Sequence, residues 1–377
     1  MHGFSVDQFI FSSNDIDLKF SPLRQNIQVD TYVLGAFNPG LARLSNGNLL
    51  IMIRVADALS QPIIGKTIHA IRWDAEAGYV LDTYPLSSVN AADPRKFQML
   101  GNPYKVMALI SLSWLLPVEL TPDGTSVVQI HYDKIIAPQR TYQEYGVEDA
   151  RISRIDDTYY MTTCSVSSER HTTTLYTSTD GLNYRLEGII LDHQNKDMVF
   201  FERKIDGNFF ALTRPLGDLY FATRSASPYY PGPSINLAQS PDGLHWKPLD
   251  EPFIRVRKGS ASTKKLGGGT QPILTDQGWL MLYHGVELQG LVGIYRTFWA
   301  LLDAQNPTQI LHLEDTKPVL EANPALTEPM KDQLYLSDVV FTTGLVDAGD
   351  YYVVASGECD LACRITHILK SRFDLGP

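Results

Sequence analysis

Two adjacent acids, Glu148 and Asp149, stand just before an arginine in the segment YGVEDARIS (145–153). A positioned carboxyl group can give up or take the proton that general acid–base catalysis moves. An acidic pair beside Arg151 is also typical of a structural ion pair, so the segment alone leaves both interpretations open. The residues that the fold brings beside Asp149 must decide between them.

The elements that could position such residues are five short apolar runs, each following a turn that contains Gly, Asp or Asn. The runs are NGNLLIMIR (46–54), DDTYYMTTC (156–164), DGNFFALTR (206–214), DQGWLMLYH (276–284) and GDYYVVASG (349–357). Their aromatic and β-branched residues are typical of strands. Five copies indicate a repeat architecture, and their uneven spacing suits a β-propeller with long loops better than a regular array.

Strongly polar residues end three of the five runs, namely Arg54, Arg214 and His284. The innermost strands of a propeller line a central channel, so residues far apart in the sequence can meet there. We therefore predict an all-β, five-bladed β-propeller. A two-domain β-sandwich protein is the structural alternative.

Other local signals also favour strands. Polar turns before an aromatic residue, at WDAEAGY (73–79), TSTDGLNY (177–184) and QSPDGLHW (239–246), predict hairpins between outer strands. Gly, Pro and β-branched residues divide the apolar stretch 97–120 into strand-sized pieces. The expected organisation is one catalytic domain over residues 1–377, with about 30 N-terminal residues as an extension.

Composition limits the classes of function. The chain has 377 residues, of which 44% are hydrophobic and 20% charged, as in a folded protein with a large core. Its formal charge of −10 disfavours nonspecific binding to nucleic acid or anionic membranes. The N-terminal MHGFSVDQFIF has no signal-peptide pattern, and no run reaches the roughly 18 apolar residues of a membrane span. These features predict a cytoplasmic protein.

The three cysteines, Cys164, Cys359 and Cys363, cannot all pair and form no zinc pattern with nearby histidines. Free cysteine is usually a small buried residue. We therefore expect buried thiols, no metal site and no resident cofactor.

Ten segments give the chain a detailed resemblance to glycoside hydrolase family 130, the mannoside phosphorylases and β-mannosidases. The segments are AFNPG (36–40), IRVAD (53–57), YGVEDAR (145–151), NKDMVFFERKIDG (195–207), TRP (213–215), KKLGGG (264–269), LYHG (282–285), IYRTFWALLD (294–303), DVVFTTG (338–344) and GECD (357–360). The resemblance extends from about residue 31 to 365. It implies a five-bladed β-propeller with Asp149 as general acid, a proton relayed through a mannose hydroxyl, and inversion at the anomeric carbon.

The same resemblance assigns binding residues. Phosphate is expected at Lys196, Arg214 and His284, whose cationic character would hold an anion. The mannoside is expected to contact Asn38, Arg54, Asp57, Arg151, Lys265, Tyr295, Phe341 and Asp360. Amide and carboxylate groups suit vicinal hydroxyls, and aromatic rings suit the C–H face of a pyranose. The implied partners are a manno-oligosaccharide and inorganic phosphate as co-substrate, without nucleic acid or membrane, and a homo-oligomer stays open.

Three departures from the family pattern bear on the reaction. Ala150 replaces the usual proline, GGGTQP (267–272) replaces the loop GAGPPP, and Glu202 stands where proline is usual. Glu202 matters most, because an inverting hydrolase needs a carboxylate base about 6.5–9.5 Å from the acid. The leading hypothesis is inverting phosphorolysis of β-linked mannosides, with β-1,2 slightly favoured, to give α-mannose 1-phosphate.

Three alternatives remain at this point. An inverting β-mannosidase would keep Asp149 and use Glu202 or Glu287 as the base. The five-bladed arabinanases and invertases would need further channel acids, at positions that here carry mainly cations and amides. A non-catalytic sugar-binding propeller would leave Asp149 dispensable.

Overall fold

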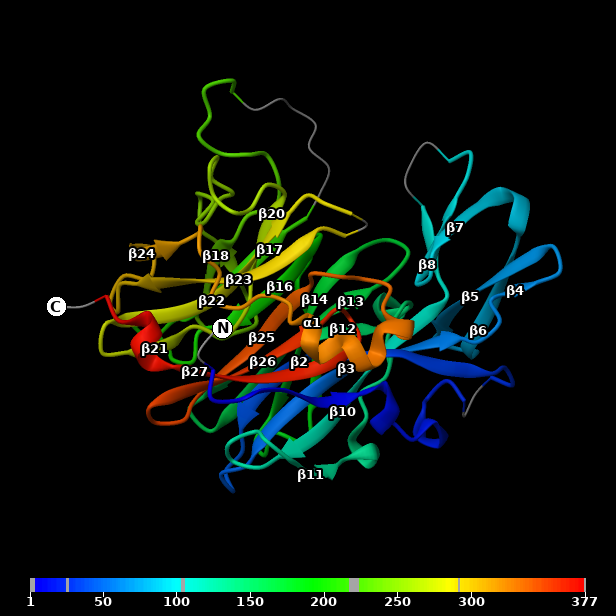
Figure 1. Ribbon diagram of the computed structural model, residues 1–377, viewed down its shortest axis with the longest axis horizontal. Helices are drawn as coiled ribbons and strands as arrows, with labels where there is room; N and C mark the ends of the chain where they lie inside the picture. The colour runs from blue at the N-terminus through cyan, green and yellow to red at the C-terminus, as the bar shows by residue number, and fades with distance from the viewer. Residues whose placement is uncertain (1–3, 25–26, 103–105, 217–223, 291, 376–377) are drawn as a thin grey trace.

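The computed structural model describes residues 4–24, 27–102, 106–216, 224–290 and 292–375. Within these ranges the chain is built of antiparallel strands, with a single short α-helix, α1 (Pro324–Thr327) (Figure 1). Short 3₁₀ turns cover Ser13–Asp15, Leu18–Phe20, Leu86–Ser88, Tyr132–Lys134, Thr141–Gln143, Glu328–Gln333 and Lys370–Phe373. The all-β class predicted from the sequence is confirmed.

Five sheets form the body of the molecule, and we number them in chain order. The first contains β2 (Thr31–Arg43), β3 (Leu49–Leu59), β10 (Ser111–Leu120) and β11 (Val127–Ile130). The second contains β12 (Val147–Ile155), β13 (Thr158–Val166), β14 (His171–Ser178) and β15 (Arg185–Leu191). The third contains β16 (Asn195–Phe200), β17 (Phe209–Pro215), β18 (Asn236–Ser240) and β19 (Lys247–Pro248).

The last two sheets each have one added feature. The fourth contains β20 (Lys265–Gly268), β22 (Gly278–Glu287), β23 (Ile294–Leu302) and β24 (Ile310–Glu314), and β21 (Ile273–Thr275) also pairs with β22. The fifth contains β25 (Val340–Asp347), β26 (Tyr351–Glu358) and β27 (Ala362–Leu369), and it is completed by β1 (Asp7–Ser12). The N-terminal segment therefore contributes a strand to this sheet.

Each of the five apolar runs found in the sequence forms the second strand of one sheet: β3, β13, β17, β22 or β26. These strands are buried nearly throughout, as in β3, where only Arg54 is partly exposed. Burial on both faces explains why the runs are continuously apolar rather than alternating. The polar residues Arg54, Arg214 and His284 therefore lie on the second strands of their sheets and not on the first strands.

Clusters of buried apolar residues fill the space between neighbouring sheets and pack them together. On β3, Leu50 packs with Met161 of the second sheet, whereas Ile51 packs with Ile365 of the fifth. Similar clusters join the second sheet to the third, the third to the fourth and the fourth to the fifth. The first strands also lie side by side, with β2 against β12 and β25, β12 against β16, and β16 against β20. Each sheet thus has two neighbours, in cyclic order.

Two small sheets are inserted between β3 and β10, and together they form the lobe at the right of Figure 1. One consists of β4 (Ile63–Ile64), β5 (Thr67–Asp74) and β6 (Gly78–Pro85). The other consists of β7 (Val89–Asp93), β8 (Lys96–Met99) and β9 (Met107–Leu109). We call these two sheets the inserted lobe.

The predicted hairpins have mixed outcomes. The turns at 177–184 and 239–246 join β14 to β15 and β18 to β19, which are outer strands as expected. The turn at 73–79 joins β5 to β6, so its assignment to an outer hairpin is wrong. The stretch 97–120 divides into β8, β9 and β10 as predicted, and its residues 103–105 lie outside the described residues.

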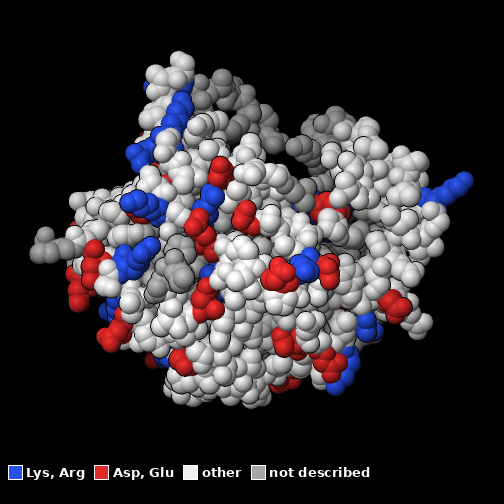
Figure 2. Space-filling view, in the orientation of Figure 1, with Lys and Arg blue, Asp and Glu red and all other residues white. Residues whose placement is uncertain are grey.

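The surface charges, the three cysteines and the helix lengths can be compared with what the sequence predicted. On the face shown in Figure 2, acidic and basic side chains are interspersed. Cys164, Cys359 and Cys363 are buried and free, as expected. No helix in the described parts of the chain has the length and hydropathy needed to cross a membrane.

Candidate active site

Three of the first strands carry the same irregularity. β2, β12 and β16 each contain a β-bulge, and within these bulges lie Asn38, Asp149 and Asp197. All three residues adopt a left-handed backbone conformation, with φ of 49°, 52° and 57°. Besides glycine, Asn and Asp reach this conformation most easily, because their short polar side chains can bond locally. The residue types found in the three bulges are therefore those that the backbone requires.

The carboxylate of Asp149 is held by two donors from the first sheet. Arg54 Nη1 on β3 donates to Asp149 Oδ1 at 3.0 Å, and Asn38 Nδ2 donates to the same oxygen at 2.9 Å. Arg54 Nε also donates to Ser113 Oγ at 2.9 Å, which fixes the direction of the guanidinium. The side chain of Asp149 remains 11% exposed. The structure thus brings two of the predicted residues, Asn38 and Arg54, to the candidate acid.

Glu148 joins this group to the third sheet. Its Oε1 accepts from Arg54 Nη2 at 2.9 Å, and its Oε2 accepts from Lys196 Nζ at 3.1 Å. Burial alone would raise the pKa of Glu148, but Arg54 and Lys196 lower it to about 2. Glu148 is therefore ionised and connects the arginine that holds Asp149 with a residue expected to bind phosphate.

A second, buried cluster lies beside Lys196, whose strand neighbour is Arg214. Arg214 Nη1 lies 2.5 Å from Asp197 Oδ2 and 3.0 Å from His284 Nε2. Arg151 Nη2 approaches Asp197 Oδ1 at 3.5 Å. Burial would raise the pKa of Asp197, yet Arg214 and His284 hold it far below its usual range. Asp197 is thus an ionised centre of this cluster.

The charge of the predicted phosphate site differs from the expectation. Burial lowers the pKa of His284 to about 4, so the ring is neutral at neutral pH and the expected third cation is wrong. Burial together with Arg214 lowers the pKa of Lys265 to about 7. Arg214 Nε and His284 Nδ1 are buried and have no hydrogen-bond partner among the described residues. Asp197 Oδ2 in the same cluster also has no hydrogen-bond partner among the described residues.

Aromatic rings border the same cluster. Lys265 Nζ lies 5.2 Å from the ring centroid of Tyr295. The ring of His284 lies 5.8 Å from that of Tyr295 and 4.6 Å from that of Phe341. The structure therefore also groups these predicted residues with His284.

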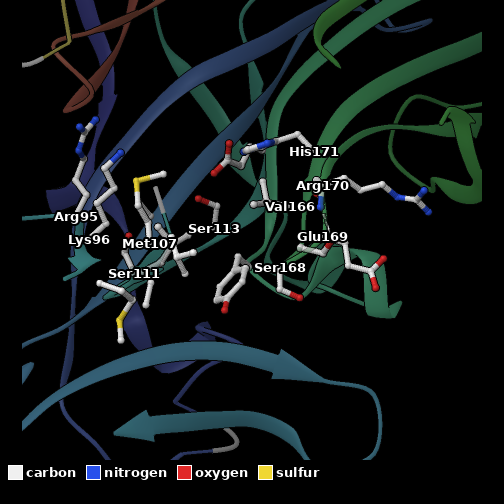
Figure 3. Close-up of a pocket in the computed structure, with 18 of the residues that line it drawn as sticks. Arg95, Lys96, Met107, Ser111, Ser113, Val166, Ser168, Glu169, Arg170 and His171 are labelled. Carbon is white, nitrogen blue, oxygen red and sulfur yellow. Dashed lines mark hydrogen bonds between the residues drawn. The ribbon is translucent and has the colours of Figure 1, made fainter. Parts of the chain in front are cut away.

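A cavity of about 900 Å³ opens above the acid cluster. Arg54, Glu148, Lys196 and Asp360 line it from the body of the molecule, and the inserted lobe lines its outer part. Figure 3 shows Arg95 and Lys96 at one side of the cavity and Ser168 to His171 at the other. Its size is in the upper part of the usual range of about 300–1,000 Å³ for ligand pockets.

Comparison with known proteins assigns a family to this arrangement. The sequence model of glycoside hydrolase family 130, described as beta-1,4-mannooligosaccharide phosphorylase, matches residues 113–372. A β-1,2-mannobiose phosphorylase of Listeria innocua is 31% identical over 376 residues, which cover 93% of this chain and 94% of the relative. The chain belongs to glycoside hydrolase family 130. The resemblance found in the sequence is confirmed.

Two further comparisons agree. A β-1,2-mannobiose phosphorylase of Thermoanaerobacter sp. is 28% identical over 245 residues, covering 64% of this chain and 73% of the relative. The solved structure of the Listeria innocua β-1,2-mannobiose phosphorylase with β-1,2-mannobiose superposes with a TM-score of 0.78 at 28% identity. That superposition covers 96% of this chain and 95% of the other. The family 130 fold thus extends over nearly the whole chain.

Of the eight predicted sugar contacts, Arg54 and Asp360 line the cavity of this family 130 protein, and Asp57 and Arg151 face other parts of the structure. Asp57 follows Arg54 by three positions on β3, and because side chains alternate along a strand, it faces the opposite side. It accepts a hydrogen bond from the Ser21 hydroxyl, and burial raises its pKa. Arg151 is only 1% exposed and donates to the carbonyl oxygens of Gly268 and Gly269. The structure therefore gives Arg151 a supporting place behind the site.

The two candidate hydrolytic bases also lie elsewhere. Glu202 Oε1 accepts from the backbone N–H of Leu274 on β21 at 3.0 Å, and burial raises its pKa. Glu287 Oε2 pairs with Arg296 Nη1 at 2.8 Å. Neither is among the described residues that line the cavity. Each acid is thus held by a partner of its own.

Sequence reasoning missed Asp197 and Arg95. Asp197 stands in the segment NKD, and its place in a bulge like those of Asn38 and Asp149 is seen only in the structure. Arg95 belongs to the inserted lobe, whose position no sequence signal gave. Within the described ranges, no group of three or more His, Cys, Asp or Glu side chains is placed to hold a metal ion.

Proposed function

We propose that this chain is an inverting mannoside phosphorylase that transfers a β-linked mannosyl group to inorganic phosphate and yields α-mannose 1-phosphate. The observation that carries the proposal is the bridge made by Glu148. Through it, Arg54, which holds the candidate acid Asp149, is joined to Lys196, which stands beside Arg214. This link supports an acid and an anion site that act next to each other.

In the proposed reaction, a phosphate oxygen attacks the anomeric carbon from the face opposite the leaving group. The bond from that carbon to the leaving oxygen breaks as the new carbon–oxygen bond forms, which inverts the configuration. Asp149 gives its proton to a mannose hydroxyl, and that hydroxyl passes its own proton to the leaving oxygen. Lys196 and Arg214 stabilise the charge of phosphate, and His284 contributes a neutral N–H.

The placement of Glu202 supports phosphorolysis over hydrolysis. A hydrolytic base must face the water that attacks the anomeric carbon. Glu202 instead accepts a backbone hydrogen bond from Leu274 on β21, in the fourth sheet. A cationic pair such as Lys196 and Arg214 suits an anionic nucleophile, whereas water does not need it.

We also infer that the five sheets are the blades of a five-bladed β-propeller that forms one catalytic domain. Their cyclic order of packing and the adjacency of the first strands support this architecture. The fifth blade would include β1 as its outer strand. In such a ring, the three bulges at Asn38, Asp149 and Asp197 would face a common channel.

The favoured substrate is a β-1,2-linked mannoside. The name of the Listeria innocua relative, which aligns over nearly the whole chain, supports this linkage. The description of the family model, beta-1,4-mannooligosaccharide phosphorylase, makes the β-1,4 linkage the necessary comparison.

One experiment tests the function. The protein is incubated with β-1,2- or β-1,4-mannobiose, with and without phosphate, and the products are separated as mannose and mannose 1-phosphate. We expect α-mannose 1-phosphate and mannose in equal amounts from the β-1,2 disaccharide, and no cleavage without phosphate. Release of free mannose alone, at the same rate in both buffers, would establish a hydrolase instead.

A further inference from the structure

The outer part of the cavity is built by the inserted lobe. Arg95 lies in the turn between β7 and β8, and its side chain lines the cavity together with that of Lys96 (Figure 3). Asp360 lines the same cavity from the turn between β26 and β27 of the fifth sheet. The cavity therefore brings together two charged residues from separate parts of the fold.

The guanidinium of Arg95, which faces Asp360, is also held by Asp93. Its Nε donates to Asp93 Oδ1 at 2.9 Å and its Nη2 donates to Asp93 Oδ2 at 2.8 Å. This two-bond geometry fixes the plane of the guanidinium. The third nitrogen, Nη1, lies 3.8 Å from Asp360 Oδ2, and the two side chains are 23% and 21% exposed. Arg95 thus presents a fixed positive charge to Asp360.

The backbone around Asp360 is equally constrained. Its φ is 53°, and its carbonyl oxygen accepts from the Tyr335 hydroxyl at 3.3 Å. A Cβ atom at Gly35 would lie 2.1 Å from that carbonyl oxygen, so β2 passes close behind it. The carboxylate is held from one side by this backbone and from the other by Arg95.

Four charged groups act on the Asp360 carboxyl. Arg54 on β3 and Arg95 of the inserted lobe lower its pKa, whereas Glu148 and Asp149 on β12 raise it. Burial is the largest influence, and the net result is a raised pKa. Arg95 and Arg54 therefore oppose the rise in the pKa of Asp360 that burial and the neighbouring acids cause.

We propose that Arg95 is a positioning residue of the sugar site, which holds the Asp360 carboxylate toward the cavity and so makes mannoside binding depend on the inserted lobe. The inference rests on the proposed function, because it assumes that Asp360 bonds the hydroxyl groups of the mannoside. Arg95 is not proposed to contact phosphate. Its loss should therefore change the KM for the mannoside and leave the KM for phosphate nearly unchanged.

The first test separates the two substrates. In Arg95→Met, the KM for β-1,2-mannobiose should rise about tenfold, as expected when a half-buried charge pair is lost, whereas the KM for phosphate should change less than about twofold. Arg95→Lys keeps the charge without the two-bond anchor and should lie between Arg95→Met and wild type. Equal KM values for mannobiose in all three proteins would overturn the proposal.

A matched control lies in the same lobe. Arg72 on β5 donates through Nε to Asp82 at 2.7 Å, and it does not line the 900 Å³ cavity. Arg72→Met removes a similar Arg–Asp pair and should leave both KM values at the wild-type level. If Arg72→Met raised the KM for mannobiose as much as Arg95→Met does, a general loosening of the lobe would replace the proposed role.

The second test asks whether Arg95 acts through Asp360. In an Asp360→Asn background, adding Arg95→Met should change the KM for mannobiose less than about twofold, because the partner charge is already gone. Asparagine also tolerates the left-handed backbone at this position. A full tenfold effect in that background would exclude the coupling.

A pH profile gives a readout that a purely structural role would not change. Without Arg95, the pKa of Asp360 should rise, so the carboxyl becomes protonated at a higher pH. The acidic limb of kcat/KM for mannobiose should therefore move to higher pH in Arg95→Met and stay in place in Arg72→Met. An unmoved limb in Arg95→Met would contradict the proposal.

The wild-type enzyme separates this inference from the proposed function. If the wild type forms no mannose 1-phosphate from mannobiose and phosphate, the proposed function fails. If the wild type forms it and Arg95→Met has unchanged constants, only the inference about Arg95 fails.

Discussion

Replacing Asp197 by Asn removes one negative charge from a buried cluster and keeps the size of the side chain. Asn adopts the left-handed conformation as readily as Asp, so the φ of 57° adds no strain to the variant. The perturbation is thus confined to the contacts that the Asp197 carboxylate makes with Arg214, Arg151 and His284.

The magnitude follows from burial. The side chain of Asp197 is 1% exposed and that of Arg214 is 5% exposed, with 2.5 Å between the charged atoms. Removing one partner of such a pair leaves a charge buried without compensation, which costs about 3–5 kcal/mol of unfolding free energy. Because Arg214 also loses its anchor, the KM for phosphate should rise at least about tenfold, the equivalent of 1.4 kcal/mol.

The assay is denaturant unfolding of both proteins at several pH values. The pKa of Asp197 is depressed in the folded state, so its stabilisation is complete above the unfolded value of about 3.9 and is lost as pH falls through the folded value. The difference between wild type and variant should therefore be constant from about pH 5 to 8 and shrink only in acid.

Asp57→Asn is the matched control. Asp57 is equally buried, but burial raises its pKa and its hydrogen bond comes from the neutral Ser21 hydroxyl. Its replacement should cost clearly less than that of Asp197 and leave the KM for phosphate unchanged. Equal losses in the two variants, or a loss below about 1 kcal/mol for Asp197→Asn, would refute the reasoning.

Three further predictions concern catalysis. Asp149→Asn should slow phosphorolysis at least about a hundredfold, whereas Asp156→Asn, at a turn with a similar φ of 54°, should keep the wild-type rate in the same assay. The KM for mannobiose should rise as pH increases through about 7, because Lys265, an expected mannoside contact, loses its charge there, and Lys265→Arg should shift this rise out of the measured range. Glu202→Gln should retain turnover within about threefold, and a hundredfold loss with free mannose as the main product would identify it as a hydrolytic base.

The sequence predicted one strand in each of the five main sheets, and the reason is burial. The second strands pack on both faces, so the sequences of β3 and β22 are nearly continuous apolar runs. The first strands gave no such signal, because Asn38, Asp149 and Asp197 interrupt β2, β12 and β16 with bulges. The polar residues of the candidate site thus interrupt the apolar pattern by which these first strands could have been predicted.

The site was predicted in part for similar physical reasons. The segment around Asp149 left its role open, and the family resemblance singled out Asp149 and Arg54, which the structure brings into contact. Asp57 was misassigned because three positions along a strand reverse the direction of a side chain. The charge of His284 depends on complete burial, which the sequence does not show. Arg95 could not be found, because its role depends on where the inserted lobe lies.

The pairing of β1 with β27 has a consequence for biosynthesis. Arg364 bonds to Asp7, 357 residues earlier in the chain. At a translation rate of about 5–20 residues per second, the first strand waits roughly 20–70 s for its partner. Until then the hydrogen-bonding edge of β1 is open, and contacts of such large sequence separation form slowly. The fifth sheet therefore assembles last, and the yield of folded protein depends on keeping this N-terminal strand from pairing with another chain in the interval.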